Sequence, residues 1–228
     1  MNTKDEIDGL PINTMTDGVS HRVADALRRI NHALAGKNIP LRDTEAFARQ
    51  LEALAEKFDA LTAEPRPREF GQLEEKSSVG TDYDYGAGYS LSFRPVSGKS
   101  NALAPPAQYF RGDQCIVGKV IFGAAYEGAP GIVHGGYTAA IMDEVFGIAM
   151  THSAIDVPCM TGTLKVIYRA PVPINAEVIY KAWLDGEEGR KAFMKCTVVD
   201  SAGKLLCEGE AIFLKIDPAF YATMGRRD

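Results

Sequence analysis

The sequence predicts an α+β fold in which an antiparallel sheet packs around one central helix and a helical extension comes first. Three observations favour this class. Two amphipathic helical patterns open the chain, one long apolar stretch at 137–150 has the length of a buried helix, and the stretches after it have the composition of strands. One helix followed by a run of hairpins implies a sheet wrapped around that helix.

The first 75 residues are predicted to form a helical hairpin extension. Apolar residues recur at steps of three and four through 19–34, and Gly36 is a natural end for such a helix. A second pattern of the same kind covers 43–61 and is closed by prolines. Each helix has one apolar face, so we expect packing on the main domain or on a second subunit. The main domain is assigned to 76–228.

The rest of the chain divides into a linker, a core helix and several strands. Residues 65–105 are rich in glycine, proline, serine and tyrosine and are predicted to be a linker, although the run Tyr89–Phe93 alternates like a strand. Turns are expected at Asp185–Gly189 and Asp200–Gly203. The predicted strands are Cys115–Tyr126, Gly162–Arg169, Ala176–Leu184, Ala192–Asp200 and Lys204–Lys215, and the core helix is Tyr137–Met150.

Composition excludes several classes of function. The chain has 228 residues, of which 46% are hydrophobic and 24% charged, with a net charge of -5, which disfavours nucleic acid as a partner. No stretch is long and apolar enough to span a bilayer, and Met1–Leu10 lacks the pattern of a signal peptide. We therefore expect a cytoplasmic protein without a membrane span. The four cysteines are too dispersed for a metal pair or a redox motif.

Glycines stand where a strand gives way to the core helix. His134 directly precedes Gly135 and Gly136. The first amides of a helix have no partners within it and the helix dipole adds to their pull, so they can hold a polarised carbonyl oxygen. The alternative, in which the glycines only permit a tight turn and His134 bonds a loop, has equal weight on this segment alone.

Two carboxylates interrupt the apolar core helix, and burying them without a purpose is costly. We expect Asp143 to face a site and Glu144 to lie on the solvated side, with a purely structural Asp143 as the alternative. Asp143 comes eight residues after Gly135, about 12 Å along the axis, too far to reach a carbonyl held at its own helix start. Two antiparallel helices about a dimer axis would bring them together, so the spacing predicts a dimer.

At these residues the sequence resembles the PaaI-type hot-dog acyl-CoA thioesterases, whose motif is a His-Gly-Gly followed by a helical Asp at the spacing of His134 and Asp143. The resemblance covers about 105–216 and leaves the helical extension outside. It continues through Thr161–Pro171, similar to a family strand that ends in Tyr-x-x-Pro, and through Glu188–Phe193 and Glu208–Lys215, similar to the long-chain acyl-CoA members.

The resemblance implies hydrolysis of acyl-CoA to a free acid and CoA, with no metal and no cofactor beyond the CoA of the substrate. The Gly135 amide, with Gly136, would polarise the thioester carbonyl. Asp143 would be the general base or the nucleophile, and His134 would shape the turn. Thr161 falls where relatives carry a Ser or Thr that orients the attacking water, with an ordinary strand hydroxyl as the alternative.

The same resemblance leaves substrate positioning less defined. Some relatives carry an Asn or Gln before the His-Gly-Gly, where this chain has Gly128 and Ala129. The phosphates of CoA are expected near Arg190 and Lys191, and Tyr168 is expected in the substrate site. Lys165 and Arg169 are alternative phosphate ligands, and for any one of these cations a solvated surface charge is the competing interpretation.

Two other functions remain open at this point. The protein can be a hot-dog module that binds acyl-CoA without turning it over. It can also be a hot-dog enoyl-CoA hydratase, which requires an Asp and a His placed differently; here the first histidine after Asp143 is His152. In each case we expect a homodimer or a dimer of dimers, and the spacing of motifs does not fix the acyl chain length.

Overall fold

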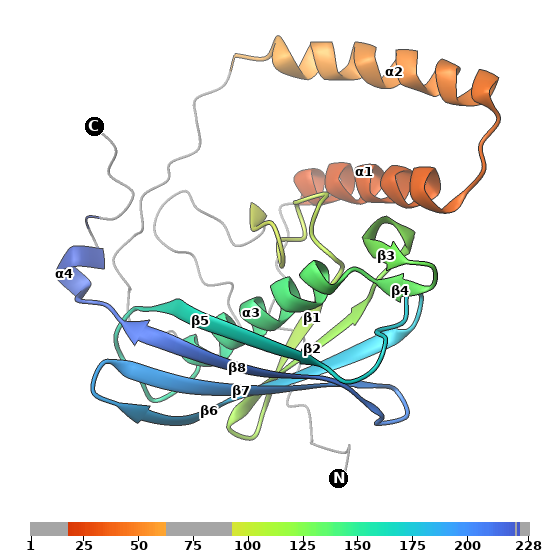
Figure 1. Ribbon diagram of the computed structural model, residues 1–228. Helices are drawn as coiled ribbons and strands as arrows, with labels where there is room; N and C mark the ends of the chain where they lie inside the picture. Colours follow the sequence, from red (N-terminus) through yellow and green to blue (C-terminus); the bar gives the residue numbers. More distant parts are fainter. Residues whose placement is uncertain (1–17, 63–92, 222, 224–228) are drawn as a thin grey trace.

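A computed structural model describes residues 18–62, 93–221 and 223. Within them, six strands form one antiparallel sheet in the order β1-β2-β6-β7-β8-β5, and helix α3 (Gly135–Thr151) lies against one face (Figure 1). This confirms the predicted sheet around a central helix. The strands of this sheet are β1 (Gln108–Gly112), β2 (Cys115–Ile121), β5 (Cys159–Tyr168), β6 (Glu177–Glu188), β7 (Lys191–Asp200) and β8 (Leu205–Lys215).

Helix α3 is the centre of the core. Its side chains Ile141, Met142, Val145 and Phe146 are fully buried, as expected for a helix that is apolar on most sides. The helix approaches the sheet so closely that a Cβ added at Gly118 of β2 would lie 2.9 Å from Val145 Cγ2. The absence of a side chain at Gly118 therefore allows α3 to pack closely against the sheet.

The strands alternate between the core and solvent. In β7 every second residue, Ala192, Met194, Cys196 and Val198, is buried against α3. This period of two is what an antiparallel sheet with one covered face requires. The four cysteines are free thiols.

The strands differ from the prediction in several places. The first strand, β1, was not predicted, and β2 ends at Ile121, followed by the short 3₁₀ helix η2 (Ala124–Tyr126). Strand β6 continues to Glu188 through the turn expected at Asp185, because a bulge between Leu184 and Gly186 keeps it paired with β7. The run 89–92 and the assumed domain boundary near residue 75 lie outside the described residues.

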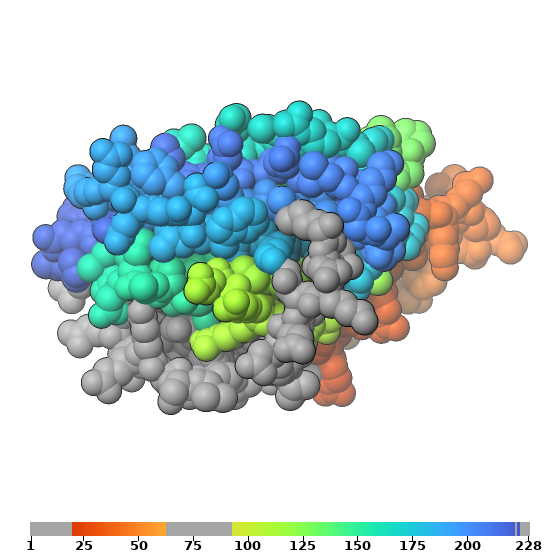
Figure 2. All heavy atoms as spheres, turned by 90° about the horizontal axis from the view of Figure 1, so that it is seen from below, coloured from red at the N-terminus to blue at the C-terminus, as the bar shows by residue number. Residues whose placement is uncertain are grey.

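The two predicted N-terminal helices are present as α1 (Gly18–Gly36) and α2 (Leu41–Asp59). Helix α1 packs on η2 so tightly that a Cβ on Gly36 would lie 2.9 Å from Ala124 Cβ. Helix α2 has no buried residue and, in orange at the right of Figure 2, extends beyond the end of the sheet. No helix in the described ranges combines the length and apolarity needed to cross a membrane.

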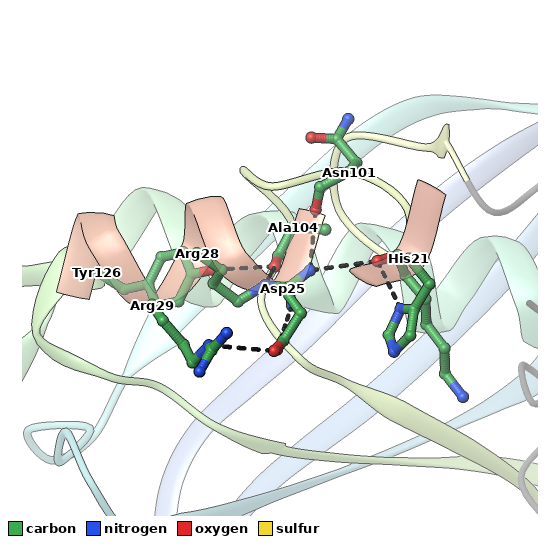
Figure 3. Close-up of polar contacts among 8 residues, drawn as sticks. His21, Asp25, Arg28, Arg29, Asn101, Ala104 and Tyr126 are labelled. Atoms are coloured by element: carbon green, nitrogen blue, oxygen red, sulfur yellow. Dashed lines mark hydrogen bonds and ion pairs between the residues drawn. The ribbon is translucent and has the colours of Figure 1, made fainter. Parts of the chain in front are cut away.

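Arg28 connects α1 with the segment at 101–104 that precedes β1 (Figure 3). Its side chain is nearly buried; Nε donates to the carbonyl of Ala104 at 3.0 Å and Nη2 donates to that of Asn101 at 3.0 Å. One turn further along α1, His32 Nδ1 accepts a hydrogen bond from the Ala125 amide at 3.0 Å. Burial, and then the charge of Arg28, lower the pKa of His32, which keeps its ring neutral and able to accept. These contacts give α1 a fixed position beside η2.

Candidate functional site

The backbone just before α3 is held from both sides. A small hairpin of β3 (Glu127–Ala129) and β4 (Ile132–Val133) leads to the helix, and its turn uses Gly131 at φ +77°, a conformation that favours glycine. The His134 amide then donates to the Tyr126 carbonyl at 2.8 Å. The start of α3 therefore has a defined direction.

Three of the first four helix amides are satisfied by His134. Its Nδ1 accepts from the Gly136 amide at 3.0 Å, and its carbonyl accepts from the amides of Tyr137 at 2.9 Å and Thr138 at 3.4 Å. Within the described part of the chain, the Gly135 amide has no acceptor. Because Nδ1 accepts, a neutral His134 ring carries its proton on Nε2. The cap thus leaves one backbone donor open at the positive end of α3.

Strand β5 fixes the other side of the same turn. The hydroxyl of Tyr168, at the end of β5, donates to the Gly135 carbonyl at 2.7 Å. A Cβ on Gly135 would lie 3.1 Å from that oxygen, so a side chain there would crowd the tyrosine. Partial burial raises the pKa of Tyr168, so its hydroxyl stays protonated and remains a donor.

Asp143 is half-buried further along α3 and faces the beginning of β5. The hydroxyl of Thr161 donates to Asp143 Oδ1 at 3.0 Å. Burial raises the pKa of Asp143, the hydrogen bond from Thr161 lowers it, and the charge of Glu144 raises it, with a net increase. A carboxylate whose pKa is raised toward neutrality is a better proton acceptor than an ordinary surface aspartate.

Glu144 is largely buried, whereas the sequence predicted that it would face solvent. Its side chain is only 16% exposed, and its Oε1 accepts from Arg94 Nη1 at 3.0 Å and from Ser97 Oγ at 2.6 Å. The prediction that it lies on the solvated side is wrong, because a cation from a distant segment compensates its charge. The signal for such a partner was present, since a carboxylate in an apolar helix requires one.

The predicted residues thus form two groups in one chain. Asp143 meets Thr161, and Gly135 meets Tyr168, His134 and Gly136. The groups are about 12 Å apart along α3 and are both connected to β5, through residues seven positions apart. The structure brings no residue of one group into hydrogen-bond contact with the other.

The predicted phosphate ligands lie at the surface. Arg190 is on the turn between β6 and β7, where its Nε donates to the Lys215 carbonyl at 3.4 Å. Lys191 is exposed and precedes Ala192, which is buried against α3, so strand alternation directs Lys191 to the opposite face of the sheet. The other two candidate cations are engaged in exposed ion pairs, Lys165 with Glu210 at 2.9 Å and Arg169 with Glu208 at 2.6 Å.

Two further features bear on the chemistry. His152 follows the C-terminal end of α3, nine residues after Asp143, and its Nδ1 lies 2.9 Å from the Ile148 carbonyl. Among the described residues, no group of three or more His, Cys, Asp or Glu side chains is arranged to hold a metal ion.

Part of this chain is similar in sequence to known proteins. Residues 130–207 match the thioesterase superfamily profile. The chain is 36% identical to the acyl-coenzyme A thioesterase THEM4 of Mus musculus over 97 residues, 42% of this chain and 41% of that protein. It is 31% identical to the protein of that name in Bos taurus over 151 residues, 66% of this chain and 57% of that protein. It therefore spans about half the length of the curated relatives it matches.

A solved structure is similar in fold over most of this chain. The crystal structure of a thioesterase superfamily protein aligns with a TM-score of 0.73 and 25% identity, covering 92% of this chain and 95% of that one. Its coverage includes part of the N-terminal region as well as the sheet. The described chain thus has the hot-dog fold, and its residues 130–207 match the thioesterase superfamily.

Proposed function

We propose that this protein hydrolyses acyl-CoA thioesters to a free acid and CoA. The observation that carries the proposal is the Gly135 amide, which is open at the positive end of α3 while its neighbours donate to His134. An oriented amide at a helix start stabilises the negative charge that develops on a thioester oxygen. The two THEM4 relatives, named as acyl-coenzyme A thioesterases, support CoA as the thiol.

The second chemical group is Asp143. As a general base, its carboxylate takes a proton from a water molecule that Thr161 helps to orient, and the hydroxide attacks the thioester carbon. The oxyanion is held by the Gly135 amide; its collapse breaks the C–S bond and releases the CoA thiolate, which then takes up a proton. As a nucleophile, Asp143 would instead form a mixed anhydride that water opens. A thiolate leaves readily, so either route needs little further help.

The reaction requires the two groups to meet, and we propose that they do so across a homodimer. Within the described ranges β5 pairs only with β8, so its other edge is an open template for pairing. If two β5 strands pair antiparallel about the midpoint between Leu164 and Lys165, Thr161 stands opposite the partner subunit's Tyr168. Asp143 then approaches the partner subunit's Gly135, and each dimer has two equivalent sites. A dimer of dimers is compatible with this arrangement.

CoA is expected to follow the end of the sheet near Thr161. In the register of the sheet, Thr161 is opposite Phe213, which is opposite Ala192, so Ala192 is about two strand spacings, roughly 10 Å, from Thr161. Arg190 precedes Ala192 by two residues. A guanidinium on a turn can bind phosphate there. Lys191 points away from the α3 face and is the weaker candidate of the two.

The test is thiol release from acyl-CoAs ranging from acetyl to palmitoyl, with Asp143→Asn compared with Asp185→Asn. Asp185 is an exposed carboxylate paired with Lys195 and serves as the matched control. We expect Asp143→Asn to lower kcat by about 100-fold or more and Asp185→Asn to have no effect. Equal turnover in both variants contradicts the proposal. Tight binding of acyl-CoA by the wild type without thiol release would favour a non-catalytic binding module, and loss of enoyl absorbance would favour a hydratase.

A further inference from the structure

A pocket of about 460 Å³ lies between α1 and the start of α3. Leu34 and Ala35 of α1 form one wall, Leu103 stands on another, and Ala125 and Tyr137 close it toward the main domain. The volume is within the range of roughly 300–1,000 Å³ typical of small-molecule sites. It is larger than a short acyl group requires.

The position of this pocket connects it with the proposed reaction centre. Tyr137 is two residues beyond Gly135 in the first turn of α3, about 3 Å further along the axis. Its ring packs edge-on against Tyr126 with centroids 4.8 Å apart, which forms an aromatic floor. The Gly135 amide is therefore within one helical turn of a residue that lines the pocket.

The chemistry of the lining selects an apolar occupant. Leu34 is 52% exposed and Leu103 is 63% exposed, so both leave apolar surface in water when the pocket is empty. The cation in the lining is Arg28, and its guanidinium already donates to the carbonyls of Ala104 and Asn101 and pairs with Asp25. It has little capacity left for a phosphate, so the nucleotide end of CoA is a poor fit.

We infer that this pocket holds the acyl chain of the substrate and that α1 is a specificity element of the enzyme. The inference rests on the proposed function, because it takes the thioester carbonyl to be at Gly135. Burial of each methylene in the pocket strengthens binding by about fourfold. Arg28 and His32 hold the α1 wall in place, and a Cβ on Gly123 would lie 2.7 Å from the His32 ring, so the wall has little freedom to retreat.

The experiment fills the pocket with Leu34→Trp and uses Leu27→Trp as the control. Leu27 is on the same helix, is 41% exposed and does not line the pocket. Binding of non-hydrolysable butyryl, octanoyl and palmitoyl thioether analogues of CoA to the full chain is measured by calorimetry. In the wild type and in Leu27→Trp we expect affinity to increase with chain length. In Leu34→Trp we expect butyryl binding within twofold of wild type and palmitoyl binding at least 10-fold weaker.

A second variant, Leu103→Trp, fills the pocket from a lining residue outside α1 and should give the same chain-length pattern. An equal loss for all three analogues, or no loss for palmitoyl in either variant, overturns the assignment. Binding is read without turnover, so the two proposals fail separately. Chain-length-dependent binding with no thiol release would contradict the hydrolase alone, whereas hydrolysis with an unchanged chain-length preference in both pocket variants would contradict the acyl pocket alone.

Discussion

The hydroxyl of Tyr168 donates to the carbonyl of Gly135 at 2.7 Å, and the next amide, that of Gly136, donates to His134 Nδ1 at 3.0 Å. Both bonds engage the same peptide unit, one at its oxygen and one at its nitrogen. Linked hydrogen bonds of this kind polarise one another and fix the plane of the peptide. Tyr168 therefore acts on the orientation of the backbone that carries the open Gly135 amide.

This relationship predicts that Tyr168 is a positioning residue. Tyr168→Phe keeps the ring and removes one hydrogen bond, a loss of about 1 kcal/mol in typical cases. We expect kcat to fall about 5- to 10-fold with KM nearly unchanged, measured with one acyl-CoA at several concentrations. Circular dichroism melting should remain close to wild type. A rise in KM with unchanged kcat would mean instead that the hydroxyl binds substrate.

The hydrogen bond between Thr161 and Asp143 predicts a pH effect. The Thr161 hydroxyl stabilises the ionised carboxylate and so lowers the pKa of Asp143 against the larger effect of burial. Thr161→Val removes that bond, so the pKa of Asp143 rises further. Since the ionised form is the active one, the acidic limb of the kcat profile should move to higher pH. The profile is measured from pH 4 to 9.

The control for this prediction is Thr163→Val. Thr163 is on the same strand, is exposed, and makes no hydrogen bond to Asp143. The acidic limb of the kcat profile of Thr163→Val should coincide with that of the wild type. If Thr161→Val also leaves the limb in place, Asp143 is not the group whose ionisation controls the rate.

The sequence alone predicted the features that depend on residues close together in the chain. Periodicity identified α1, α2, α3 and most strands, because the side chains that face the core repeat at helical or strand intervals. The spacing of Gly135 and Asp143 on one helix likewise gave a distance along its axis. The strand boundary at Asp185 failed because a bulge, which depends on the neighbouring strand, carried β6 through a sequence typical of a turn.

Contacts between distant segments could not be obtained from spacing. Glu144 is paired with Arg94, fifty residues earlier, and Arg28 bonds carbonyls more than seventy residues later. The hydrogen bond from the Gly136 amide to His134 Nδ1 also depends on the rotamer of His134. In each case the partner is chosen by the tertiary packing around the residue.

The anchoring of α1 provides a prediction on stability. The Arg28 side chain is 9% exposed, pairs with Asp25 and donates to the carbonyls of Ala104 and Asn101. Arg29 is 75% exposed and also pairs with Asp25. Arg28→Met leaves these carbonyls without their donor, and we expect a loss of about 3 kcal/mol in the free energy of unfolding, with faster hydrogen exchange throughout residues 18–36. Arg29→Met removes an exposed ion pair and should cost less than about 0.5 kcal/mol.

Similar hydrogen exchange in both variants would show that the apolar contacts of α1 with η2 hold the helix without Arg28. In that case the acyl pocket would keep its wall in the Arg28→Met protein, and chain-length preference would be unchanged. If α1 does detach, palmitoyl binding should weaken along with the exchange protection of the helix, because both depend on the same contact.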